Sequence, residues 1–225
     1  MSLHDDPLTA FVRAVDDANE RNLSRLERAA QRLRPTPATD TPPLRAVEVG
    51  DLRTATAEPP SFVVEPIIPR GEVTLFGGHG GSGKSALALV IAAHVAAGVP
   101  WAGLSVAQGR VLFVTLEDPA GRVVWRLRAI CEAYGLPMHA VARGLVIFDG
   151  TDDAEDCALA RESTASGRAL LESTTAEGQI RVAADGAALV VIDNASDAFD
   201  GNENERRQVR AFVRMLASIA RQHGA

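Results

Sequence analysis

Short runs of apolar, β-branched and aromatic residues recur along the second half of the chain, with helical patterns between them. Such runs are typical of buried strands, which do not alternate because both faces of their sheet are covered. The runs span residues 72–77, 110–116, 145–148 and 187–192. Strands that alternate with helices indicate βαβ units, so the pattern predicts an α/β fold with a mostly parallel sheet flanked by helices.

Three helices are predicted between and after these strands, and the first of them is almost wholly apolar, as expected for a helix covered on more than one side. They span residues 85–97, 120–134 and 203–223. In the last helix the predicted inward positions are Val209, Phe212, Val213, Leu216 and Ile219. Gly224 stands where a helix C-terminal cap is expected. Residues 151–184 begin with clustered acids and are predicted to be a helical excursion.

The N-terminal part of the chain has a different pattern. Residues 1–34 carry apolar positions at helical spacing after an Asp6-Pro7 start signal, which predicts an amphipathic helix or helix pair. Six of the twelve prolines fall within residues 35–60, which predicts an extended linker. The core domain is then residues 61–225. The helix could pack on that core, pair with another subunit or dock a partner, and an interaction role is favoured.

Composition limits the class of protein and the compartment in which it is expected. The 225 residues are 46% hydrophobic, enough for a substantial core, and no apolar run is long enough to cross a membrane. The acidic N-terminus is unlike a signal peptide, so the protein is expected to be cytoplasmic. The net charge of −6 argues against a surface that binds nucleic acid simply by being basic, although it leaves room for a local basic channel.

A glycine-rich segment gives the clearest chemical signal. Residues 78–85 match the phosphate-binding loop G-x-x-x-x-G-K-[ST], between a predicted strand and a predicted helix. Lys84 is the only lysine of the chain and would reach the β- and γ-phosphates of a nucleotide, while the Ser85 hydroxyl would bind Mg²⁺. The predicted nucleotide-binding residues are Gly78, His79, Gly80, Gly81, Ser82, Gly83, Lys84, Ser85 and Ala86. The plainer alternative is a strand-to-helix turn without a ligand.

Acidic residues follow the later strands. Asp193 comes directly after an apolar run, as in a Walker B strand, and would hold Mg²⁺ together with Ser85. Glu117 follows the second strand and would act as the catalytic base that activates water. Asp118, which precedes a proline, suits a helix cap better. Each carboxylate could also be an ordinary turn or cap residue.

Together these motifs resemble a known family. The phosphate loop, the Leu116-Glu-Asp-Pro119 segment and residues 190–197 are similar to the RecA-like AAA family ATPases of the plasmid and phage RepA hexameric replicative helicase type. The resemblance implies that Lys84, Ser85, Glu117 and Asp193 carry out ATP hydrolysis. It also matches Arg126 to a family arginine near the active site, where the alternative is a solvated helix residue.

The chain also departs from that family. RecA-like domains continue into a further strand, which lies between the phosphate-loop strand and the Walker B strand, and then into an arginine finger. Residues up to Ala225 contain neither, so a truncated chain of doubtful isolated activity is expected. Two unpaired backbone rows would be left in the sheet. The last helix carries a stripe of arginines that could contact nucleic acid or another subunit, or be a solvated face. The stripe is Arg206, Arg207, Arg210, Arg214 and Arg221.

Three functions are compatible with these motifs. The first is a Mg²⁺-dependent ATPase that works as a helicase-type motor of DNA replication, assembled as a homo-oligomeric ring such as a hexamer, with single-stranded DNA as its partner. The second is a nucleotide-responsive regulatory protein that switches conformation without translocating. The third and least favoured is a small-molecule kinase that shares the phosphate loop.

Overall fold

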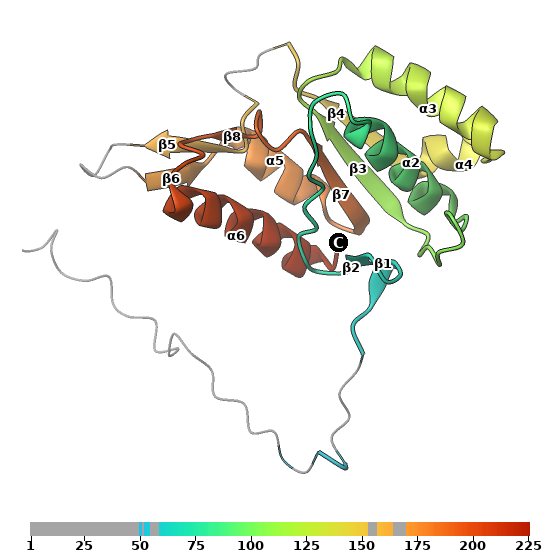
Figure 1. Ribbon diagram of the computed structural model, residues 1–225, viewed down its shortest axis with the longest axis horizontal. Coiled ribbons are helices and arrows are strands. Elements are labelled where there is room, and N and C mark those ends of the chain that lie inside the picture. The colour runs from blue at the N-terminus through green and yellow to red at the C-terminus, as the bar shows by residue number, and fades with distance from the viewer. Residues whose placement is uncertain (1–49, 51, 55–58, 153–156, 164–169) are drawn as a thin grey trace, which may run out of the picture. The chain divides into compact units, whose positions relative to one another are not determined.

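A computed structural model describes residues 50, 52–54, 59–152, 157–163 and 170–225 (Figure 1). The chain divides into two units, Met1–Ala57 and Glu58–Ala225, and all the described helices and strands belong to the second. The predicted helix of residues 1–34 and most of the predicted linker of residues 35–60 lie outside the described residues.

The centre of this unit is a three-stranded parallel sheet in the order β4-β3-β7. Its strands are β3 (Arg110–Thr115), β4 (Leu145–Asp149) and β7 (Ala187–Asp193). Three of the four predicted strands are thus confirmed, and so is the predicted parallel α/β architecture. Thr115 lies opposite both Asp149 and Asp193, so the three strands end at one edge of the sheet. The acids that follow the strands therefore gather at that edge.

Helices cover both faces of the sheet (Figure 1). Val111 and Phe113 of β3 pack in one core with α2 (Lys84–Ala97), α3 (Ala120–Tyr134) and α4 (Met138–Gly144). The intervening side chains, Leu112 and Val114, pack on the other side with α5 (Thr175–Ala183) and α6 (Arg206–His223). Successive strand residues point to opposite faces, so a strand covered on both sides has to be apolar throughout. None of the helices that the structure describes is long and apolar enough to cross a membrane.

Residues 151–184 only partly match their prediction. They contain α5, but the described part also forms β5 (Ala160–Ser163) and β6 (Leu170–Ser173). These strands pair with each other in antiparallel fashion, and β5 pairs in parallel with β8 (Phe199–Asp200). The prediction of a helical excursion was wrong for this small sheet. Its strands are short, and part of their pairing comes from β8, which is distant in the sequence.

Helix α6 ends as predicted, with Gly224 in the left-handed conformation at φ 68°. Its buried face differs from the prediction, because Val209 and Val213 are 36% and 43% exposed. Gln208 is buried in their place. Its side chain accepts a hydrogen bond from the backbone N–H of Asn202 and donates one to Glu162. Two hydrogen bonds satisfy the buried amide, which is why a polar residue can occupy an inward position.

Residues 72–77 do not form the predicted buried strand. The hairpin before them consists of β1 (Phe62–Val64) and β2 (Ile68–Pro69), but residues 72–77 themselves have no strand assignment. Leu75 is 81% exposed and Phe76 50%. A strand is held by hydrogen bonds to a neighbour, and among the described strands none pairs with this segment, while β7 pairs with β3 alone.

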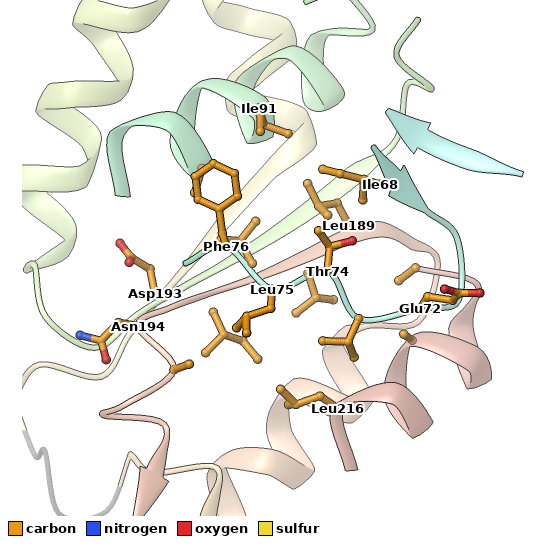
Figure 2. A pocket seen from close by; sticks show the side chains of 18 of the residues that line it. Ile68, Glu72, Thr74, Leu75, Phe76, Ile91, Leu189, Asp193, Asn194 and Leu216 are labelled. Atoms are coloured by element: carbon orange, nitrogen blue, oxygen red, sulfur yellow. The ribbon is translucent and has the colours of Figure 1, made fainter. Parts of the chain in front are cut away.

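A cavity of about 380 Å³ is lined by both residues 72–78 and β7 (Figure 2). Ile91 of α2 and Leu216 of α6 also line it, so its walls are largely apolar. Asp193 and Asn194 lie at one end of the cavity, and Glu72 lies at the other. The cavity separates the extended segment from the nearest edge of the sheet, which accounts for the exposure of Leu75.

Candidate functional site

The glycine-rich loop leads directly into α2, which begins at Lys84. Gly81 and Gly83 have φ values of 73° and 85°, a region that residues with a Cβ rarely adopt. A Cβ on Gly78 would lie 2.9 Å from the Ser82 hydroxyl oxygen. The path of the loop thus requires glycine at 81 and 83, whereas a Cβ at 78 would require the Ser82 side chain to move. His79, Gly80 and Ser82 are exposed in this loop, and Ala86 lies in the first turn of α2.

The N-terminus of α2 is open to an anion. No side chain caps it, and its first turn contains no acidic residue. The first backbone N–H groups of a helix have no partner within the helix, and the helix dipole adds a partial positive charge there. This arrangement suits a phosphate group.

Lys84 folds back over the loop. Its Nζ donates hydrogen bonds to the carbonyl oxygens of Gly78 and His79, at 2.8 and 2.9 Å. The ammonium group therefore lies above the loop and next to the helix N-terminus, where a phosphate would find both positive charges. Phosphate oxygens are charged acceptors and compete well with neutral carbonyl groups for such a donor.

Ser85 and Asp193 meet in space although 108 positions separate them. The Ser85 hydroxyl donates to Asp193 Oδ1 at 3.0 Å. Burial raises the pKa of Asp193, as do the charges of Glu117 and Asp118, whereas the Ser85 hydrogen bond and the charge of Arg126 oppose this rise. A hydroxyl and a carboxylate are oxygen ligands of the kind that Mg²⁺ prefers, so the donor set fits the predicted ion.

Glu117 lies two residues beyond the end of β3, at the same edge of the sheet. Its side chain is exposed, and its Oε2 accepts a hydrogen bond from Asn194 Nδ2 at 3.2 Å. Its negative charge is close enough to raise the pKa of Asp193. The structure therefore brings Glu117 to the Ser85–Asp193 pair.

Asp118 holds two arginines of α3. Arg122 Nη1 donates to its Oδ1 at 2.6 Å, and Arg126 donates to its Oδ2. Burial would raise the pKa of Asp118, but the hydrogen bonds and positive charges of the two arginines lower it below its ordinary value. Arg126 is thus not a freely solvated helix residue. Its guanidinium group is held beside the site by an ion pair.

Asp118 does not cap α3, so this prediction was wrong. The N-cap residue is Pro119, and the first N–H group of the helix is bound by the side chain of Asp149. Asp149 Oδ2 accepts the backbone N–H of Ala120 at 2.6 Å, and its Oδ1 accepts the backbone N–H and the hydroxyl of Thr151. The hydrogen bond from Ala120 and those from Thr151 lower the pKa of Asp149. The carboxylate of Asp118 binds the two arginines instead.

Sequence reasoning missed two polar residues of the site, Asn194 and Asp197. Asn194 Nδ2 donates to Asp197 Oδ2 at 3.0 Å as well as to Glu117. The peptide bond between Asp193 and Asn194 is cis. The signal that could have found Asn194 is its place directly after Asp193, once the register of β3 against β7 is known.

Comparison with known proteins agrees with this geometry. A family model described as an AAA domain matches residues 37–225, a range that includes the loop, the sheet and all the acids described above. No curated protein matches the chain. A glycine loop that opens a helix N-terminus, and a carboxylate on a neighbouring strand that meets the first turn of that helix, are what a P-loop ATPase requires. The chain therefore belongs to the AAA domain family, a group of P-loop ATPases.

Proposed function

We propose that this chain binds ATP and hydrolyses it in a reaction that depends on Mg²⁺. The observation that carries the proposal is the hydrogen bond between Ser85 and Asp193. It places a hydroxyl and a carboxylate together at the N-terminus of α2, beside the ammonium group of Lys84. Bound Mg²⁺ would neutralise phosphate charge at this point.

The positions of the other residues support a proposed role for each. Lys84 and the loop from Gly78 to Ala86 would hold the phosphates. Glu117, two residues beyond the last residue of β3, would orient the attacking water and accept its proton. Arg126, held by Asp118, would bring positive charge to the phosphates.

Substitution of Glu117 by Gln tests this assignment. The variant should bind ATP as the wild type does but turn it over about 100-fold more slowly or worse, because the amide cannot accept the proton. Glu132→Gln is a matched control, since Glu132 lies on α3 in an exposed ion pair with Arg128. Equal turnover in Glu117→Gln and wild type would show that Glu117 is not the catalytic base. If the wild-type protein does not bind ATP, the whole proposal is wrong.

The more specific proposal is that hydrolysis drives a helicase-type motor on single-stranded DNA, within a homo-oligomeric ring. Its support is the arginine stripe of α6 (Arg206, Arg207, Arg210, Arg214 and Arg221), all of whose residues are exposed. Arginines that bind the phosphate groups of DNA do so through charge, whatever the base sequence of the DNA. Residues 61–225 would be the core of the motor and residues 1–34 a docking element.

Stimulation by DNA distinguishes a motor from a nucleotide-responsive regulatory protein. Turnover should rise with single-stranded DNA, and the double substitution Arg210→Glu and Arg214→Glu should remove that rise without changing turnover in its absence. Affinity for the DNA should also fall steeply as the salt concentration rises. Equal turnover with and without DNA would favour the regulatory protein.

A further inference from the structure

We infer that Asn194 is a positioning residue that holds the carboxylate of Glu117 in place for the reaction. The inference rests on the proposed hydrolytic function and deepens it. Its basis is the hydrogen bond from Asn194 Nδ2 to Glu117 Oε2, 3.2 Å long, which links the residue after β7 to the segment after β3. Asn194 itself need not touch the nucleotide.

The strand register explains why these two residues meet. Thr115 lies opposite Asp193, and the backbone N–H of Leu116 donates to the carbonyl oxygen of Asp193 at 2.7 Å. The two chain segments therefore leave the sheet side by side. Glu117 and Asn194 are the residues that come after this last hydrogen bond, so their side chains start from neighbouring points.

The orientation of the Asn194 amide is fixed by its other contacts. Its Oδ1 accepts the backbone N–H of Asp197 at 2.8 Å, and an N–H group needs an acceptor. The NH₂ group must then be the end that faces Glu117 and Asp197 Oδ2. Asn194 can donate to both carboxylates because its amide has two N–H bonds.

Glu117 needs such a partner because its side chain is exposed. The carboxylate groups of Asp118 and Asp193 come from the same edge of the sheet, where β3 and β7 end. Among the described residues, Asn194 provides the only side-chain hydrogen bond to Glu117. Without it, an exposed glutamate would rotate away from the other carboxylates, and the attacking water would lose its orientation.

A purely structural role for Asn194 has to be separated from this one, because its Oδ1 also closes a turn. Asn202 offers a control, since its Oδ1 also accepts a backbone N–H of its own loop, that of Asn204 two residues on, at 2.9 Å. Asn194→Ala should lower kcat about 10-fold or more, with KM and ATP affinity within about 2-fold of wild type. Asn202→Ala should leave kcat unchanged.

A double-mutant cycle shows whether Asn194 acts through Glu117. In a Glu117→Gln background, Asn194→Ala should cause no further loss of turnover, because the base that it positions is already absent. Losses that multiply in the double variant would overturn the inference, and so would a wild-type kcat in Asn194→Ala. If Glu117→Gln itself keeps full turnover, it is the proposed role of Glu117 that fails.

A spectroscopic measurement tests the contact even where turnover is absent. The side-chain NH₂ resonances of Asn194 can be identified by their loss from the NMR spectrum of Asn194→Ala. They should shift in Glu117→Ala and stay in place in Glu132→Ala, which removes a distant carboxylate. Unchanged Asn194 resonances in Glu117→Ala would overturn the inference whatever the activity of the protein.

Discussion

The hydroxyl of Ser85 donates to Oδ1 of Asp193, which joins the first turn of α2 to the last residue of β7. The two oxygen atoms, 3.0 Å apart, are held together by the protein itself. This pairing restrains two side chains that Mg²⁺ would otherwise have to order, so part of the entropy cost of binding is met in advance.

Asp193→Asn is expected to stabilise the ligand-free protein and weaken ATP binding in the presence of Mg²⁺. Burial raises the pKa of Asp193, so ionisation at neutral pH is less favourable in the folded protein than in the unfolded chain and lowers stability. This penalty is absent below the unfolded pKa of about 3.9 and grows as pH rises through the folded pKa. Asparagine keeps an acceptor for Ser85 without the charge.

Urea unfolding at pH 7, compared with the exposed control Asp152→Asn, measures this effect on the free energy of unfolding. ATP affinity with and without Mg²⁺ measures the second effect. A less stable Asp193→Asn with unchanged affinity would contradict both expectations.

Replacement of Lys84 should abolish ATP binding without unfolding the protein. Among the described residues, the ammonium group of Lys84 donates hydrogen bonds only to the carbonyl oxygens of Gly78 and His79, so Lys84→Ala should leave the melting temperature nearly unchanged. Lys84→Arg should also bind poorly, because a planar guanidinium group does not replace a compact ammonium group within this loop. Titration with a fluorescent ATP analogue checks both, and Arg128→Ala serves as the control. Normal affinity in Lys84→Arg would show that charge alone is sufficient.

Asp149→Ala should destabilise the protein by about 1 kcal/mol at pH 7, the usual cost of losing a helix cap. The pKa of Asp149 is lowered in the folded protein, so its contribution is present above the unfolded pKa of about 3.9 and disappears as pH falls through the folded value. Wild type and variant should therefore converge in stability in acid. Unfolding curves at several pH values measure this, with Asp152→Ala as the control. A difference that persists at about pH 2, below the unfolded pKa, would mean that the side chain acts by packing.

Leu75→Ala should change the free energy of unfolding by no more than about 0.5 kcal/mol, because this side chain is 81% exposed. Leu112→Ala should cost about 2–5 kcal/mol, since Leu112 is fully buried in β3. The pair compares an apolar residue of the extended segment with one of the sheet. Similar losses in both variants would mean that residues 72–77 are buried after all.

The sequence predicted those parts of the fold in which the local pattern of apolar residues matches the burial that the whole fold requires. Strand β3 has apolar residues throughout and helices on both sides, and α3 begins and ends at the predicted residues. The phosphate loop is local, so its glycines could be recognised directly. The parts that were missed depend on contacts between distant residues. Strand β5 pairs partly with the distant β8, and the exposure of Leu75 reflects a missing neighbour among the described strands.

The same distinction holds at the site. Glu117, Asp193 and Ser85 could be proposed from the positions at which strands and loops end. The contact between Asp149 and the start of α3 could not be predicted, because it depends on the pairing of β3 with β4, which brings Asp149 to that helix. Asn194 became recognisable only through the register of two strands.

Lys84, as the only lysine, also carries the only ε-amine of the chain. Reagents that acylate primary amines can therefore react only there and at the α-amino group of the polypeptide. Immobilisation on a sensor surface by amine coupling would attach many molecules through the phosphate loop and leave them unable to bind ATP. In solution, the extent to which Lys84 is acylated would measure the fraction of molecules whose phosphate loop holds no nucleotide.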